Sequence, residues 1–349
     1  VTARNTAIDR LRREASRDDR YAQAALLQQR AQDADASTSE GTVTDDRLRL
    51  IFTCCHPALA RASQVALTLR LLGGLHTPEI AKAFLTAEPA MAQRLVRAKR
   101  KIKNAKIAYR IPTEAELPER LSAVLTVIYL IFNEGYAASS GDNLVRPDLC
   151  AEAIRLARIL AELMPDEPEV LGLLALLLLT ESRRLARTAD DGSMVLLPDQ
   201  DRRRWDRALI VEGQVIVRSC LRRNLPGPFQ IQAAIAAVHS DAPTAMDTDW
   251  QQILALYDQL AGRNQTPVVI LNRAVAVAQI DGAATALALI DGLELSDYHL
   301  FHSTRAELLR RLGRTEEAIE ANRRARELTD NVAEQELLAG RIAELSQRS

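Results

Sequence analysis

The residues best suited to binding chemistry form a run of Lys and Arg between Arg94 and Arg110. No Asp or Glu lies between Pro89 and Thr113 to balance them, whereas an ordinary solvated helix mixes charges of both signs. The formal net charge of the chain is only −1, so this concentration of cations is a local feature. The run predicts a surface that binds a polyanion such as DNA. A helical hairpin with a solvated basic face is the alternative.

Two short helices are expected to position these cations. Thr77 is suited to capping the first helix, with Pro78 at its first position and Glu79 near the positive end of its dipole. The second helix has an apolar side, because four residues recur at three- and four-residue steps: Met91, Leu95, Ala98 and Ile102. Two such helices joined by a tight turn predict a helix-turn-helix, whose second helix enters the major groove of DNA.

Adjacent Cys54 and Cys55, followed by His56, raise the question of a metal site. Neighbouring side chains on a helix point about 100° apart, and the sequence has no second pair with ligand spacing. Buried apolar thiols are the better interpretation, and we expect neither a metal nor another cofactor.

A set of polar residues in the middle of the chain could suggest catalysis: Asn133, Glu134, Asp199, Asp201 and Arg202. Their spacing fixes neither a nucleophile with its base nor a set of metal ligands, and helix capping explains them equally well. We therefore expect no enzymatic activity, unless Glu134, Asp199 and Asp201 converge in a pocket.

The composition favours an all-α fold. The 349 residues are 47% hydrophobic but only 4% aromatic, with many Ala, Leu and Arg, and we predict no strand. The longest apolar run, from Val170 to Thr180, is too short to span a bilayer, and the sequence shows no signal peptide. We expect a cytoplasmic protein without a membrane partner.

The last third of the chain contains an internal repeat. The segment RAVAVAQIDGAATALALID from Arg273 aligns with RAELLRRLGRTEEAIEANR from Arg305 at an offset of 32 residues. This period is similar to that of tetratricopeptide-type helical pairs, which stack into a solenoid with a concave binding surface. The surface is expected to bind a protein partner or to fold back on the DNA-binding region.

Several segments resemble one family, the extracytoplasmic-function (ECF) sigma factors of bacterial RNA polymerase. TARNTAIDRLRRE resembles the last helix of their second region, and GLHTPEIAKAFLTAEPAMAQRLVRAKRKI resembles their fourth region, a helix-turn-helix that reads the upstream promoter element. DDRLRLIFTCCHPAL resembles the hallmark of a subgroup with a long helical extension. Three further segments resemble that extension: YLIFNEGYAASSG, DLCAEAIRLARILAELMPDEPEVLGLLALLLL and LPDQDRRRWD.

The resemblance implies promoter DNA and the RNA polymerase core as partners, and it implies roles for particular residues. At the front of the recognition helix, facing base edges, it places Glu88, Gln93, Arg94 and Arg97. Farther along, Lys99, Arg100, Lys101 and Lys103 are expected to bind phosphates. By the same resemblance, Asn5, Asp9 and Arg12 belong to a helix that contacts the downstream element.

Five segments are expected along the chain. They are a remnant of the second region (1–30), an acidic linker (31–46), a region 4 domain (47–112), a helical extension (113–240) and tetratricopeptide-like repeats (241–349). Most of the second region, which grips the polymerase core in this family, is missing from the sequence, so we expect an N-terminally truncated chain. The competing hypothesis is a helical-repeat scaffold whose basic segment docks an acidic protein without specific DNA binding.

Overall fold

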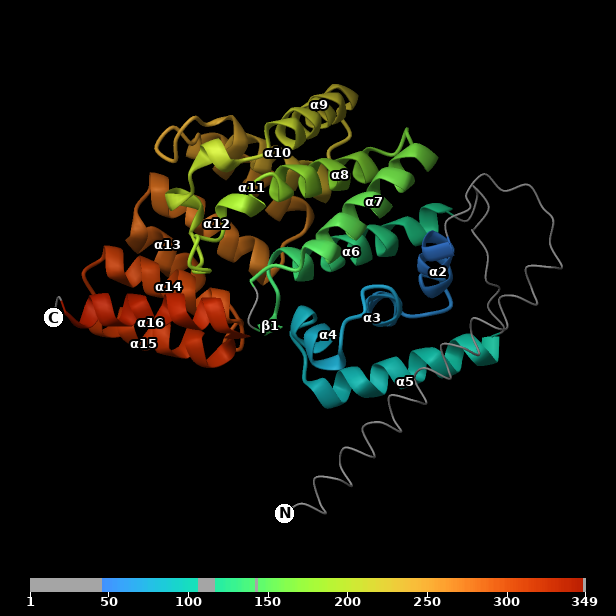
Figure 1. Ribbon diagram of the computed structural model, residues 1–349, viewed down its shortest axis with the longest axis horizontal. Helices are drawn as coiled ribbons and strands as arrows, with labels where there is room; N and C mark the ends of the chain where they lie inside the picture. The colour runs from blue at the N-terminus through green and yellow to red at the C-terminus, as the bar shows by residue number, and fades with distance from the viewer. Residues whose placement is uncertain (1–45, 106–116, 142–143, 348–349) are drawn as a thin grey trace, which may run out of the picture.

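The computed structural model describes residues 46–105, 117–141 and 144–347, and their fold is all-α, as predicted. Four helices come first: α2 (Asp46–Cys54), α3 (Arg61–Leu71), α4 (Thr77–Ala83) and α5 (Glu88–Ala105). Helix α5 lies along one edge of the molecule, next to α3 and α4 (Figure 1). Start signals for α4 and hydrophobic spacing for α5 thus predicted both helices of the helix-turn-helix.

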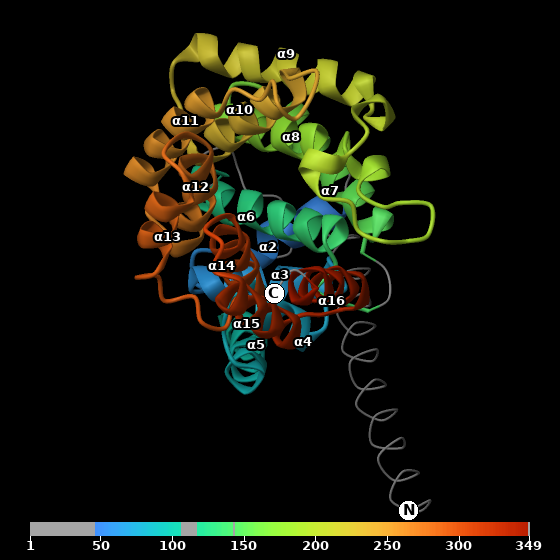
Figure 2. The same cartoon turned by 90° about the vertical axis from the view of Figure 1, so that its left-hand side faces the viewer.

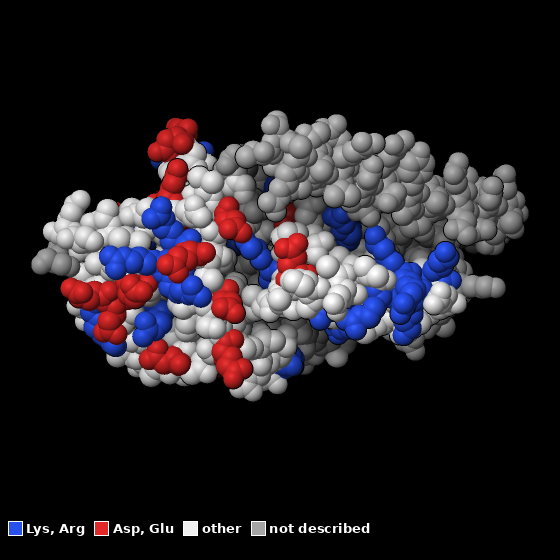
Figure 3. Space-filling model, turned by 90° about the horizontal axis from the view of Figure 1, so that it is seen from below, with Lys and Arg blue, Asp and Glu red and all other residues white. Residues whose placement is uncertain are grey.

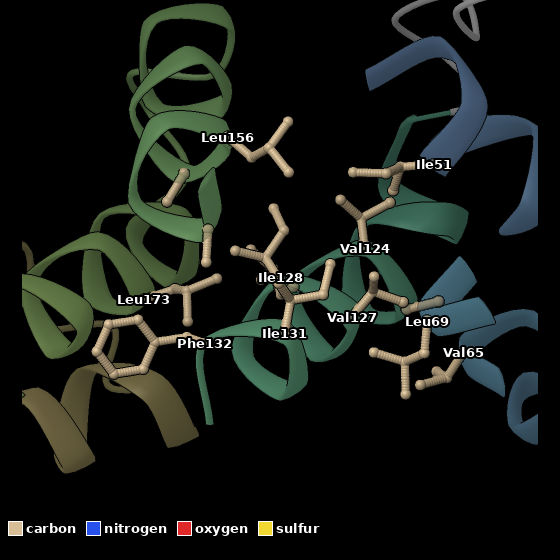
Figure 4. Close-up of a cluster of buried hydrophobic side chains, with 14 of the residues drawn as sticks. Ile51, Val65, Leu69, Val124, Val127, Ile128, Ile131, Phe132, Leu156 and Leu173 are labelled. Carbon is tan, nitrogen blue, oxygen red and sulfur yellow. The ribbon is translucent and has the colours of Figure 1, made fainter. Parts of the chain in front are cut away.

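Helix α6 (Leu117–Tyr136) runs through the centre of the molecule and joins its two halves. It packs against α2 and α3 on one side and against α7 (Pro147–Leu163) and α8 (Pro168–Glu181) on the other. Figure 4 shows this continuous core, with Val65 of α3 at one end and Leu173 of α8 at the other. Residues 133–136 form the last turn of this helix.

The next three helices are α9 (Arg207–Arg223), α10 (Pro228–Asp241) and α11 (Trp250–Arg263). Helices α9 and α10 pack on α8, and α11 packs on α10. Three short 3₁₀ turns precede it: η2 (Arg184–Ala186), η3 (Leu197–Asp199) and η4 (Arg202–Arg204). Helix α9 begins at Arg207. The reason is local, because the Asp206 carboxylate accepts hydrogen bonds from the N–H groups of Ala208 and Leu209 and so caps the helix there.

The two copies of the repeat lie in two pairs of helices, which are α12 (Pro267–Ile280) with α13 (Ala283–Ile290) and α14 (His299–Arg311) with α15 (Thr315–Leu328). Helix α16 (Val332–Ser346) follows them. Positions 32 residues apart have matching environments. Arg273 pairs with Asp258 at 2.7 Å, and Arg305 pairs with Asp291 at 3.3 Å. The internal repeat of the sequence therefore corresponds to equivalent positions in consecutive pairs of helices.

The helices from α6 onward follow a curve that brings the junction of α15 and α16 back to β1, near α4 (Figures 1 and 2). Two strands that the sequence did not predict close this curve. Strand β1 (Ser140–Gly141) pairs in parallel with β2 (Asp330–Asn331), so that Ser140 lies opposite Asp330. Each strand has only two residues, which is too short for a hydrophobic pattern. The two strands are also almost 200 positions apart in the sequence, so no local signal predicts their pairing.

Candidate nucleic-acid interface

The turn between α4 and α5 is fixed by backbone hydrogen bonds. The Thr86 N–H donates to the Ala81 carbonyl at 3.0 Å, and Leu85 adopts a left-handed conformation with φ of 48°. Helix α4 begins one residue away from the predicted cap: His76 is the N-cap, and the Glu79 carboxylate accepts a hydrogen bond from its N–H. Thr77 is the first helical residue instead, because Glu79 lies three positions after His76 and completes a capping box there.

The inward side of α5 matches the predicted stripe. Met91, Leu95 and Ala98 are buried, at 0%, 6% and 3% exposure, and Ile102 is partly buried beside Ala98. These residues pack on α3 and α4 and fix the orientation of α5. The opposite side of the helix is consequently held toward the solvent.

Seven of the eight residues predicted on α5 to bind DNA are exposed: Glu88, Gln93, Arg97, Lys99, Arg100, Lys101 and Lys103. Gln93 and Arg100 lie nearly opposite the buried stripe, because each residue advances about 100° around the helix. Figure 3 shows a cluster of Lys and Arg at one end of the molecule, apart from the mixed charges at the other end. Asn5, Asp9 and Arg12 lie outside the described residues.

Arg94 differs from its predicted neighbours. Its side chain is partly buried, and its guanidinium carbon lies 5.6 Å from the centre of the Phe84 ring at the end of α4. A cation at this distance from an aromatic ring is attracted to it. Arg94 therefore supports the turn between the two helices as well as facing the predicted interface.

Two residues near this surface were missed from the sequence. Val96 is 66% exposed on α5, one position before Arg97. Its apolar side chain interrupts the charged run, and this interruption was a signal in the sequence. Lys82 of α4 forms an ion pair with Asp330, 248 residues away along the chain, and no local pattern predicts this contact.

Comparison with known families agrees with this geometry. The sigma-70 region 4 family matches residues 49–102, which include α3, α4 and nearly all of α5. The chain contains a sigma-70 region 4 domain, which indicates a sigma factor. Its helix-turn-helix is the promoter-binding domain of a sigma factor, which acts with RNA polymerase.

The rest of this sigma factor also has relatives. Residues 120–221 match a family of unknown function, DUF6596. An uncharacterized protein of Rhizobium meliloti (strain 1021) is 46% identical over 340 residues, which cover 95% of this chain and 79% of that relative. The two proteins therefore belong to the same family over nearly the whole length of this chain.

The polar residues of the extension have separate partners. Glu134 accepts a hydrogen bond from the Ser139 N–H at 3.1 Å, and burial raises the pKa of its carboxyl group. Asp201 caps η4 and binds Arg203, whereas Arg202 donates to the carbonyls of His239 and Ala242. These contacts cap and join structural elements, and the sigma-70 match points to a transcription factor rather than an enzyme.

Cys54 and Cys55 are buried, as predicted, and Cys150 and Cys220 are buried as well. Burial raises the pKa of the Cys55 thiol, and the His56 Nδ1 atom accepts a hydrogen bond from the Ala58 N–H. Within the described ranges, no three His, Cys, Asp or Glu side chains are grouped as a metal site would need. In the same part of the chain, no helix has the length and apolar character needed to cross a membrane.

Proposed function

We propose that this protein is a sigma factor of the ECF type and that the exposed face of α5 reads the upstream promoter element. The observation that carries the proposal is the orientation of α5. Its three buried residues turn a row of cations and amides toward the solvent, and no Asp or Glu follows Glu88 in this helix. A recognition helix needs this arrangement, because phosphate contacts supply affinity and contacts with base edges supply sequence preference.

The residues of α5 divide into two groups under this proposal. Gln93 and Arg97, together with Glu88 and Arg94, face base edges, where Arg suits guanine and Gln suits adenine. Lys99, Arg100, Lys101 and Lys103 neutralise phosphates. If about five cations do so, the logarithm of affinity falls with log salt at a slope of about −4 to −5.

The segment that follows region 4 has a regulatory or partner-binding role in this proposal. It includes the tetratricopeptide-like pairs α12 to α15, and the curve of the fold brings its end beside α4. Asn5, Asp9 and Arg12 remain candidates for the downstream promoter element, and the RNA polymerase core is the expected protein partner. A promoter-binding factor of this kind works in the cytoplasm.

Substitution of single cations tests the assignment of α5. We expect Arg97→Ala to weaken binding to a promoter-derived duplex by about 1–3 kcal/mol and to reduce its preference over a scrambled duplex at equal salt. Arg94→Ala should weaken binding as well, partly through the loss of its contact with Phe84. Arg222→Ala, which removes an exposed arginine of α9, serves as the matched control.

The result that contradicts the proposal is a pair of variants, Arg94→Ala and Arg97→Ala, that bind and discriminate as the parent chain does. In that case α5 is not the recognition helix.

One observation favours the scaffold hypothesis as a second function. Helix α9 exposes Val211, Val215 and Leu221, at 57%, 53% and 63%, near Arg218 and Arg222. Exposed apolar side chains near arginines suit an acidic protein segment. This hypothesis predicts equal binding of promoter and scrambled duplexes. The test uses the whole chain, because the hydrophobic core around α6 includes residues of α2 and α3 and would be cut in a shorter fragment.

A further inference from the structure

The end of the repeat region is joined to the segment after α6, next to the first helix of the helix-turn-helix. Strand β2 pairs with β1, and Asn331 is completely buried in the joint. Its Nδ2 atom donates to the Ala138 carbonyl at 3.0 Å, while its Oδ1 atom accepts from the Glu334 N–H at 3.3 Å and caps α16. This joint fixes the backbone of Asp330, the residue before Asn331, against α4.

From that position Asp330 binds Lys82, the one Lys or Arg of α4. The Lys82 ammonium forms an ion pair with the Asp330 carboxylate and donates to the Ser139 carbonyl at 3.3 Å. Both side chains of the pair are exposed to water, at 38% and 67%. Exposed ion pairs contribute little stability. The buried joint therefore keeps Asp330 near Lys82, and Lys82 can exchange the Asp330 carboxylate for another anion.

Lys82 lies where a second anion could reach it. In a helix-turn-helix the first helix crosses the DNA backbone while the second enters the major groove, and α4 is that first helix. A DNA phosphate and the Asp330 carboxylate are both oxygen anions that an ammonium group binds in the same way. The two cannot occupy the same place beside the Lys82 ammonium.

We infer that Lys82 is a phosphate-binding residue of region 4 and that Asp330 competes with DNA for it. This inference rests on the proposed promoter binding by α4 and α5 and names its regulation. The C-terminal segment of residues 329–331 acts as a latch that withholds one phosphate contact. A partner that displaces this segment from β1 releases Lys82 and strengthens binding to DNA of any sequence.

A double-mutant cycle with Asp330→Asn and Lys82→Met tests the inference. Asp330→Asn keeps the size of the side chain and removes its charge, so Lys82 becomes available to a phosphate. The salt slope of duplex binding should become steeper by about 0.9, the value for one additional phosphate contact. In the Lys82→Met background, Asp330→Asn should produce no such increment.

Asp297→Asn is the matched control, because it removes the same charge from a side chain that is 92% exposed and lies 3.9 Å from Arg324. Its salt slope should equal that of the parent chain. Hydrogen exchange of the β1 and β2 amides shows whether Asp330→Asn leaves the backbone joint intact.

Each outcome decides the inference. It is overturned if Asp330→Asn leaves the slope unchanged, if the increment persists in the Lys82→Met background, or if no variant binds any duplex. The proposed function is tested by a different result, because it fails if promoter and scrambled duplexes bind equally. The double-mutant cycle tests only the phosphate contact of Lys82, so it can be measured on either duplex.

Discussion

Replacement of Met91 by Ala should detach α5 from the rest of region 4. Helix α5 has 18 residues, of which only Met91, Leu95 and Ala98 are buried, and Met91 is fully enclosed. Truncation of a buried Met to Ala costs about 2–5 kcal/mol. Full burial of one such side chain contributes about 1.5–3 kcal/mol. Since α5 buries only three residues, the loss at Met91 is a large share of the free energy that holds α5 on the domain.

Hydrogen exchange of the α5 amides measures this change locally. A loss of 2 kcal/mol or more corresponds to exchange that is faster by about 30-fold or more, since about 1.4 kcal/mol is a factor of ten. Amides of α15, whose Ala318 and Ala321 belong to another buried cluster, should exchange at unchanged rates.

Val96→Ala is the matched control on the same helix. Val96 is 66% exposed, so its truncation should change stability by less than about 0.5 kcal/mol. The reasoning is refuted if the two variants accelerate α5 exchange equally, or if Met91→Ala has no effect on it.

Three further predictions concern the surface, the packing and the pH dependence. Lys103→Ala should make the salt slope of duplex binding shallower by about 0.9 without changing the preference for the promoter duplex, and a changed preference would contradict its role as a phosphate contact. In denaturant titrations, Gly172→Ala should cost about 1–3 kcal/mol, because its Cβ would lie 2.7 Å from the Gln230 backbone nitrogen of α10. Gly340→Ala of α16, whose Cβ would meet no described atom within 4 Å, should instead be neutral or stabilising. Burial, together with the charges of Arg183 and Arg202, lowers the pKa of His239 from 6.5 to about 4. The unfolded chain therefore takes up this proton first, so stability should fall as the pH drops from 6.5 to 4, and His239→Gln should remove that part of the fall in melting temperature. An identical pH dependence in the variant would show that another group is responsible.

Local patterns predicted the helices of region 4 because these helices depend on local information. The spacing of Met91, Leu95 and Ala98 defines the buried side of α5, and the exposed cations follow from it. The sequence also showed the 32-residue repeat, and in the structure Arg273 and Arg305 occupy equivalent places in successive pairs of helices.

Contacts between distant residues could not be predicted in this way. The ion pair of Lys82 with Asp330 joins residues 248 positions apart, and β1 and β2 are two residues long. The partial burial of Arg94 also depends on the position of the Phe84 ring, which the turn between α4 and α5 determines. Charge and periodicity therefore predicted α5 as the recognition helix, whereas the structure was needed to find the distant contacts of the helix-turn-helix.

The central claim is that α5 reads promoter sequence. The most direct test is equilibrium binding of the whole chain to a promoter-derived duplex and to a scrambled duplex of equal length across a salt series. The account predicts tighter binding to the promoter duplex at every salt concentration, with a slope of about −4 to −5. Equal affinities for the two duplexes at every salt concentration would contradict it, because the surface of α5 would then be a basic patch that does not distinguish sequences.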